Sequence, residues 1–346
     1  MKNSDKTPLL KASGLRVSYG IGGGIFSRAK KTFNAVDGVS FDIPRHATVG
    51  VVGESGCGKS VTSLSLMQLL QRPSGQTVGG EIRFNIGDGK AYNIVNTPTA
   101  LMQDIRGSKI SMIFQEPMTS LNPVFRIGDQ VDEVTRLHNP EMSAEAVKAR
   151  TLEMLDLVGI ANKEGVYKMY PHELSGGMRQ RVMIAIALAC SPTLIIADEP
   201  TTALDVTIQA QILDLLQNLK DKLNSSIMLI THDLGVVAGM ADYVVVMYAG
   251  RVVEKGTVQE IFANPAHPYT IGLMASKPVI NKRVDRLYSI PGKVPNPIDM
   301  PDYCYFRDRC EMCVEGCKGK YPHEIHLTDT HVVSCYRYAE NGKEGK

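Results

Sequence analysis

The chain has 346 residues, enough for one large domain or two smaller ones, and its 38 basic and 36 acidic residues nearly balance. Because the charges balance, the chain lacks the excess of basic residues that is typical of nucleic-acid binding, so we expect no nucleic-acid partner. No apolar run approaches the roughly 20 residues that cross a bilayer, and the first residues lack the apolar core of a secretory signal. We therefore expect a soluble, cytosolic chain that reaches a membrane only through a partner.

Apolar patterning predicts an alternation of strands and helices through most of the chain. The predicted strands are 9–17, 36–43, 46–52, 193–197, 226–230 and 243–248. Alternation over 81–92 predicts a further pair of strands with a turn at 87–89. The predicted helices cover 61–70, 127–165, 179–190 and 207–223. This order is typical of an α/β protein in which helices cover the faces of a largely parallel sheet. From about residue 256 the sequence becomes rich in Pro, His, Tyr and Cys, and we predict a domain boundary there.

A glycine-rich loop lies between a predicted buried strand and a predicted helix. Its glycines let the backbone curl so that successive N–H groups point at phosphate oxygens. Lys59 can then reach the β- and γ-phosphates of a nucleotide, and the Ser60 hydroxyl can ligate Mg²⁺. The pattern predicts a nucleoside triphosphate site formed by Gly53, Glu54, Ser55, Gly56, Cys57, Gly58, Lys59 and Ser60.

A second group of candidate residues follows the apolar run 194–197, which is typical of a strand buried on both faces. Asp198 at the end of this run can hold Mg²⁺, and Glu199 faces the other way and can polarise an attacking water. Upstream, Ser175 can cap a long helix, and the two glycines after it leave backbone N–H groups free for an anion. Together with the phosphate loop, these residues predict an NTP-hydrolysing enzyme.

The run Leu-Ser-Gly-Gly-Met at 174–178 resembles the signature motif of ATP-binding cassette (ABC) ATPases, which usually reads Leu-Ser-Gly-Gly-Gln. The resemblance extends over residues 9–256. It implies a P-loop NTPase fold with a RecA-like core, an antiparallel β subdomain and a helical subdomain at about 120–180.

The same resemblance implies roles for individual residues. Tyr19 is expected to stack on adenine, Gln115 to contact Mg²⁺ or the lytic water, and His232 to contact the γ-phosphate. Glu199 is then the general base, helped by His232, and catalysis consists mostly of positioning and charge stabilisation. The residues expected to hold Mg²⁺ are Ser60, Gln115 and Asp198.

ABC cassettes pair head to tail, so the resemblance implies that each ATP lies between the phosphate loop of one cassette and the signature motif of the other. Closing such a dimer needs the γ-phosphate, and hydrolysis releases it. The residues expected to contact ATP on the facing cassette are Ser175, Gly176, Gly177, Met178 and Asp205.

The amino-acid sequences of several stretches closely resemble those of the D-type ATP-binding protein of dipeptide and oligopeptide importers. These stretches are 36–41, 53–66, 114–123, 171–187 and 197–209, with 264–270 and 290–296 matching the C-terminal extension of the same family. The loop at 22–28 looks more like the F-type partner. The implied domains are an ABC ATPase domain at 8–256 and a C-terminal extension at 257–346.

This resemblance implies an ATPase subunit, peripheral on the cytoplasmic face of the cell membrane, that energises uptake of di- or oligopeptides with ATP and Mg²⁺. Its expected partners are an F-type ATP-binding subunit, two transmembrane permease subunits and an external substrate-binding protein. The sequence leaves the substrate open, because the family also serves nickel, oligosaccharides and antimicrobial peptides. A soluble regulatory ABC ATPase is the alternative from a different class.

Five of the seven cysteines fall near the end of the chain. Four thiolates can close a tetrahedral Zn²⁺ site or hold a [4Fe–4S] cluster, and disulfides are disfavoured in a reducing cytosol. The spacing of the cysteines repeats that of the family's extension, which resembles a [4Fe–4S] site, so we expect this cluster, with Zn²⁺ or free thiols as alternatives. Its expected ligands are Cys304, Cys310, Cys317 and Cys335. Cys313 lies outside the pattern and offers an alternative ligand beside Cys310.

Overall fold

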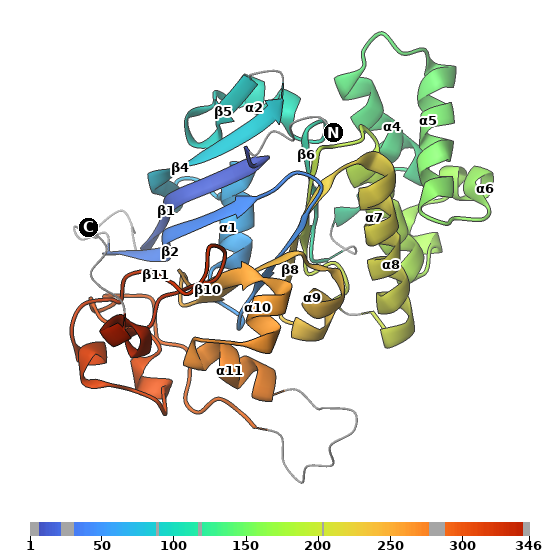
Figure 1. Cartoon of the computed structure of the whole chain (residues 1–346). Helices are drawn as coiled ribbons and strands as arrows, with labels where there is room; N and C mark the ends of the chain where they lie inside the picture. The colour runs from blue at the N-terminus through green and yellow to red at the C-terminus, as the bar shows by residue number, and fades with distance from the viewer. Residues whose placement is uncertain are drawn as a thin grey trace, which may run out of the picture. The chain divides into compact units, whose positions relative to one another are not determined.

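The computed structural model describes residues 7–21, 31–87, 90–116, 120–202, 204–276 and 288–341 (Figure 1). Its backbone forms two compact units. The first combines Ile43–Thr48 and Phe84–Ile230 with the start of the chain, and the second combines Lys11–Asp42, Val49–Arg83 and Thr231–Lys346. We describe each unit by itself. The predicted boundary at residue 256 stays a prediction, and the F-like loop at 22–28 lies outside the described residues.

The first unit is built on parallel strands β6 (Ile110–Ile113), β7 (Leu194–Asp198) and β8 (Ser226–Thr231). All of β7 and β8 is buried, which explains why both strands read as continuous apolar runs. In the register of β6 and β7, Ile113 lies opposite Ala197. The carboxyl ends of these two strands therefore meet at one edge of the sheet.

Helices make up most of the rest of the first unit. They are α2 (Thr99–Ile105), α4 (Ile127–His138), α5 (Ala144–Leu157), α6 (Lys163–Lys168), α7 (Gly176–Leu188) and α8 (Val206–Leu223), and strand β5 (Lys90–Asn93) also belongs to this unit. In Figure 1, α4, α5 and α6 lie together as a green helical group beside α7. The predicted helical character of 127–165 is therefore confirmed.

A buried carboxylate holds this helical group together. Asp132 on α4 is fully buried, and it accepts hydrogen bonds from Thr151 on α5 over 2.5 Å and from the Tyr167 hydroxyl on α6 over 2.8 Å. Arg136 adds an ion pair at 2.9 Å. Burial, followed by the hydrogen bond to Asp132, raises the pKa of Tyr167 to about 12. Because a buried charge is costly unless it is satisfied, these bonds fix the relative positions of three helices.

The second unit contains two groups of strands. In one, β1 (Leu10–Ile21), β2 (Lys31–Ile43) and β4 (Gly75–Gly87) lie in the order β2-β1-β4. In the other, β3 pairs in parallel with β9, and the antiparallel strands β10, β12 and β11 follow. Their bounds are β3 (Thr48–Val52), β9 (Tyr243–Tyr248), β10 (Arg251–Thr257), β11 (Ile325–His326) and β12 (Val332–Val333). The helices of this unit are α1 (Lys59–Leu66), α9 (Leu234–Met240), α10 (Val258–Ala263) and α11 (Pro268–Ala275).

The end of the chain is part of the sheet of the second unit. Val333 of β12 lies opposite Glu254 of β10, and Ile325 of β11 lies opposite Val333. The backbone of residues beyond 256 is therefore hydrogen-bonded to β10, which belongs to the same sheet as β9 and β3. None of the described helices combines the length and the apolar character needed to cross a bilayer.

Several predicted helix limits differ from the structure, and two of the differences have a clear local cause. Helix α1 ends at Leu66, not at residue 70, because Gln68 adopts the left-handed conformation with a φ of 49°. Helix α7 begins at Gly176, not at residue 179, because Ser175 already acts as its N-cap and accepts a hydrogen bond from the Met178 N–H over 3.4 Å.

Candidate active site

The glycine-rich loop forms a tight turn between β3 and α1 in the second unit. A Cβ atom on Gly53, whose φ is 154°, would lie 2.2 Å from the Met247 carbonyl oxygen and 2.7 Å from the Cys57 sulfur. At Gly58, with a φ of 98°, a Cβ would lie 2.7 Å from the Ala35 carbonyl oxygen. Both positions therefore require glycine, and the loop has the close backbone approach that the sequence predicts.

Lys59 lies within this loop. Its side chain is buried, and its Nζ donates hydrogen bonds to the carbonyl oxygens of Gly53 over 2.8 Å and of Glu54 over 3.0 Å. Ser60 follows in the first turn of α1. The ammonium group is thus held by neutral backbone oxygens of the loop, and its role toward the phosphates stays a prediction.

Tyr19 forms part of an aromatic surface in the same unit. Its ring stacks on Phe33, with 5.8 Å between ring centroids and 22° between ring planes. Gly75 supports the ring, since a Cβ there would lie 2.7 Å from a Tyr19 ring carbon. Partial burial raises the pKa of Tyr19. Sequence reasoning missed Phe33, although an aromatic residue on the neighbouring strand β2 was an available signal.

The second unit also contains His232. This residue is exposed and follows directly after β8, where Asp233 caps α9 by accepting a hydrogen bond from the Gly235 N–H over 2.7 Å. The cap fixes the backbone immediately after His232. Its predicted role toward a γ-phosphate stays a prediction.

In the first unit, the structure brings Gln115 and Glu199 together at the carboxyl edge of β6 and β7. The Gln115 Nε2 donates to the Glu199 Oε2 over 3.2 Å, and the Thr202 hydroxyl donates to the same oxygen over 2.9 Å. Asp198, the last residue of β7, is buried. In open α/β sheets, ligands bind at the carboxyl ends of the strands, so this edge fits a catalytic role.

Glu199 has an unusual backbone conformation. Its φ is 46°, in the left-handed region, and its N–H donates to the Ile230 carbonyl oxygen over 2.9 Å. A non-glycine residue in this region costs about 1–3 kcal/mol, and such strain gathers at functional sites. The turn directs the carboxylate toward Gln115 and Thr202. Sequence reasoning missed Thr202, for which only its position three residues after Glu199 gave a signal.

The signature residues begin α7 in the first unit. Ser175 and Gly176 are exposed, and a Cβ on Gly176 would meet nothing within 4 Å. Asp205 is likewise an N-cap, because its Oδ1 accepts from the Ile208 N–H at the start of α8 over 2.9 Å. Gln180 ties α7 to the turn after Glu199 by donating to the Pro200 carbonyl oxygen over 2.6 Å. The exposed end of α7 thus offers backbone N–H groups to an external anion.

The predicted residues therefore form two separate sets. The phosphate loop, Tyr19 and His232 belong to the second unit, whereas Gln115, Asp198, Glu199, Asp205 and the signature residues belong to the first. In the second unit, the phosphate loop is internally hydrogen-bonded. In the first unit, Gln115 and Glu199 are in contact.

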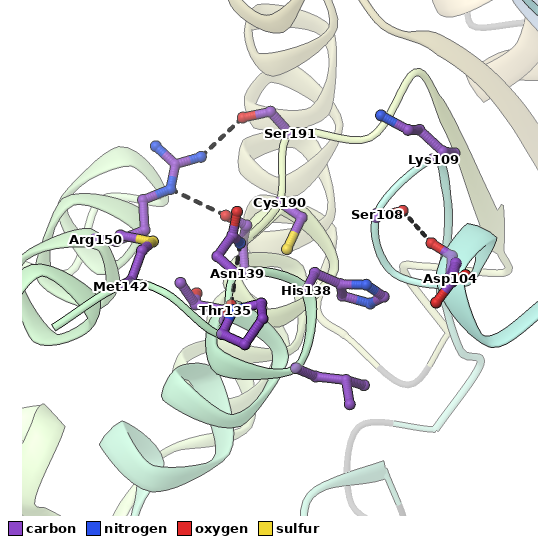
Figure 2. A pocket seen from close by; sticks show the side chains of 13 residues that line it. Asp104, Ser108, Lys109, Thr135, His138, Asn139, Met142, Arg150, Cys190 and Ser191 are labelled. Atoms are coloured by element: carbon purple, nitrogen blue, oxygen red, sulfur yellow. Dashed lines mark hydrogen bonds between the residues drawn. The ribbon is translucent and has the colours of Figure 1, made fainter. Parts of the chain in front are cut away.

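A cavity of about 640 Å³ in the first unit contains none of these residues (Figure 2). Its lining includes Lys109 and Ser191, which precede β6 and β7, so the cavity lies at the amino ends of these strands. Arg150 spans it and donates to the Ser191 hydroxyl over 2.8 Å and to the Ala189 carbonyl oxygen over 3.0 Å (Figure 2). The carboxyl edge, not this cavity, carries the candidate catalytic residues.

The cysteines of the C-terminal region are free thiols. Cys304, Cys317 and Cys335 are buried, and Cys313 is exposed. Burial raises the pKa of Cys304 to about 12 and that of Cys310 to about 11, and charge on the neighbouring thiols adds to both shifts. Among the described residues, no three His, Cys, Asp or Glu side chains are arranged to hold a metal ion. The predicted cluster and its Zn²⁺ alternative stay predictions.

Comparison with known proteins gives two family matches. Residues 36–202 match the ABC transporter family, and residues 253–317 match the C-terminal region of oligopeptide and dipeptide transporters. The chain is 50% identical over 319 residues to the oligopeptide transport ATP-binding protein AppD of Bacillus subtilis, covering 92% of this chain and 95% of that protein. It is 47% identical over 328 residues to the dipeptide transport ATP-binding protein DppD of the same organism, covering 95% and 94%.

A solved structure agrees with these matches. The fold is similar to that of a dimeric bacterial ABC transporter cassette, with a TM-score of 0.61 at 27% sequence identity over 72% of this chain and 98% of that one. The phosphate loop, the strand with its terminal acids and the family matches together define an ABC ATPase. The chain belongs to the ABC transporter family, among the ATP-binding proteins of oligopeptide and dipeptide transport.

Proposed function

We propose that this chain binds ATP at residues 53–60 and hydrolyses it to drive import of di- or oligopeptides. The observation that most supports hydrolysis is the contact between Gln115 and Glu199. It holds a candidate general base beside an amide that can orient the lytic water. Ser60, Gln115 and Asp198 are the proposed Mg²⁺ ligands. Bound Mg²⁺ would offset the charge that develops on the phosphates during hydrolysis.

The peptide substrate is supported by the C-terminal match. The family model that fits residues 253–317 is that of oligopeptide and dipeptide transporters, and the relatives above carry the same description. To test the substrate, the chain is reconstituted in vesicles with its permease subunits and a binding protein. Uptake of a labelled peptide that needs ATP supports the proposal. Uptake of nickel or an oligosaccharide alone, or ATPase activity without any permease partner, contradicts it.

The exposed start of α7 supports a composite site shared with a facing cassette. A relative of this fold was solved as a dimer, and Ser175 to Met178 of this chain are suited to contact a γ-phosphate held elsewhere. We assign an F-type ATP-binding subunit as the partner. Co-purification of the two cassettes in the presence of ATP tests this pairing, and a complex of two copies of this chain alone would contradict it.

The stretch 114–129 is the proposed contact with the permease. Its side chains Phe114, Val124 and Phe125 are apolar and exposed by 41%, 71% and 54%. Three exposed apolar side chains within one short stretch of sequence favour a protein contact, which would hold the chain on the cytoplasmic face of the membrane. The variant F125S is expected to lose transport while keeping ATP hydrolysis. The variant L137S is the matched control, because Leu137 is also exposed by 71% but lies at the far end of α4. Equal transport by both variants would contradict the docking proposal.

Cys304, Cys310, Cys317 and Cys335 are proposed to bind a [4Fe–4S] cluster. Four free thiols, three of them buried, support this proposal, as does the spacing of the four cysteines in the sequence. Purification without oxygen, followed by iron and sulfide analysis, tests it. Four iron and four sulfide per chain are expected, and stoichiometric zinc in a colourless protein would contradict the cluster.

A further inference from the structure

Glu54, the second residue of the phosphate loop, is held by residues from the C-terminal part of the chain. Its carboxylate forms a two-pronged ion pair with Arg309, with distances of 2.6 Å from Nη1 to Oε2 and 3.0 Å from Nη2 to Oε1. These residues are 255 positions apart in the sequence but belong to the same compact unit. Paired hydrogen bonds between guanidinium and carboxylate fix both the distance and the orientation of the two groups.

Arg309 is itself held firmly. Its side chain is 7% exposed, its Nε donates to the Pro291 carbonyl oxygen over 2.8 Å, and its Nη1 also donates to the Tyr248 hydroxyl over 3.3 Å. The guanidinium lies 5.9 Å from the centre of the Phe306 ring. An arginine guanidinium stays protonated in proteins, so Arg309 is charged. The Arg309 guanidinium is therefore a fixed positive charge beside the phosphate loop.

Tyr269 on α11 provides a second anchor. Its hydroxyl accepts a hydrogen bond from the Glu54 backbone N–H over 2.7 Å. The ring is completely buried against Tyr248 and Phe306, at centroid distances of 4.7 Å and 5.4 Å. Because that aromatic cluster cannot move without leaving a cavity, the start of the loop is held in one place.

Both anchors act on the residue that also binds the phosphate-loop lysine. Glu54 gives its N–H to Tyr269, its carboxylate to Arg309 and its carbonyl oxygen to the Lys59 ammonium. We infer that Arg309 and Tyr269 are positioning residues of the phosphate loop, through which the C-terminal region sets the affinity for the triphosphate. This inference rests on the proposal that residues 53–60 bind ATP.

The cysteines lie on the turn that carries Arg309. The Arg307 N–H donates to the Cys304 carbonyl oxygen over 3.0 Å, and the Cys310 N–H donates to the Arg307 carbonyl oxygen over 3.1 Å. Arg309 is therefore placed by a short turn whose two ends are cysteines.

The test compares R309Q with R307Q. Arg307 lies on the same turn and pairs with a carboxylate, Asp308, at 3.0 Å, but it does not contact the loop. Binding of MgATP and steady-state hydrolysis are measured for both variants. Since the loop is displaced but the catalytic acids are intact, R309Q should bind MgATP about tenfold more weakly and raise KM similarly, with kcat changed less than about threefold. R307Q should match the wild-type chain.

Further variants separate positioning from simple loss of folding. R309K keeps the charge but not the two-pronged geometry, and it should recover part of the affinity. Y269F should weaken MgATP binding by about two- to fivefold. It should lower the melting temperature less than truncation of a core side chain would. E54Q and R309Q combined should bind no more weakly than R309Q alone, because both changes break one contact.

Three results would overturn the inference. They are wild-type affinity in R309Q, equal losses in R309Q and R307Q, and fully additive losses in the combined E54Q and R309Q variant. The K59A variant distinguishes failure of this inference from failure of the proposed function. If K59A binds MgATP as tightly as the wild-type chain, the loop is not the ATP site; if K59A loses binding and R309Q does not, only the positioning role is wrong.

Discussion

The Gln115 side-chain amide donates a hydrogen bond to the Glu199 carboxylate over 3.2 Å, although the two residues are 84 positions apart. The contact exists because β6 and β7 are parallel neighbours whose carboxyl ends meet. It gives the first unit a carboxylate oxygen that accepts hydrogen bonds from both the Gln115 amide and the Thr202 hydroxyl. That arrangement leads to the first two predictions.

The variant E199Q should bind MgATP with nearly wild-type affinity but hydrolyse it far more slowly. A general base contributes typically about 10²–10⁴-fold to the rate, and glutamine keeps the size of glutamate while losing its basicity. Single-turnover hydrolysis and equilibrium binding measure the two properties separately. Turnover near the wild-type rate would remove Glu199 from the role of base.

The variant T202V should lower kcat by about tenfold and leave KM nearly unchanged, because a misplaced base weakens the transition state more than substrate binding. Its matched control is T201V, one residue away in the same turn, where no hydroxyl bonds to Glu199. Equal rates for T202V and the wild-type chain would contradict a role for the Thr202 hydroxyl in orienting the carboxylate.

The variant S175R should bind MgATP as the wild-type chain does but fail to pair with a facing cassette. Arginine blocks the exposed start of α7, whereas the phosphate loop lies in the other unit. Light scattering of the chain mixed with its F-type partner, in the E199Q background where ATP is not consumed, measures the ATP-dependent dimer. The control is S143R, which removes another exposed serine N-cap, that of α5, at a similar cost of about 1 kcal/mol. Dimers in both variants would contradict the composite site.

Glu260 should make the stability of the second unit sensitive to acid. Partial burial raises its pKa, but hydrogen bonds from Thr328, Thr257 and Thr330 outweigh this and lower it to about 2 from the ordinary 4.5. A folded-state pKa below the unfolded value gives stability that is complete above about 4.5 and is lost as the pH falls toward about 2. This carboxylate links the start of α10 to residues 328–330.

The measurement is the melting temperature of E260Q relative to the wild-type chain at pH 7 and pH 3. The variant should melt lower at pH 7, and the difference should shrink at pH 3, where the wild-type carboxylate begins to accept a proton. The exposed Glu141, changed to glutamine, serves as the control. A difference that is the same at both pH values would contradict the role of the charge.

Much of the local structure follows from sequence patterns. The buried strands at 194–198 and 226–231 were predicted within one residue, because continuous apolar runs are typical of strands in parallel sheets. The N-cap role of Ser175 followed from its position before a helix, although that helix begins three residues earlier than predicted. Helix α1 is shorter than predicted, since apolar periodicity continues past the left-handed residue Gln68.

The sequence by itself determined the phosphate loop and the family, because eight consecutive residues and their neighbouring strand and helix specify that turn through local backbone geometry. Only the tertiary structure decided which side chains hold the site in place. Phe33 under Tyr19, Thr202 on Glu199, and Arg309 with Tyr269 on Glu54 depend on strand register and on packing between distant segments. Such contacts leave no periodic pattern in the chain, because each is specified by the fold and not by neighbours in sequence.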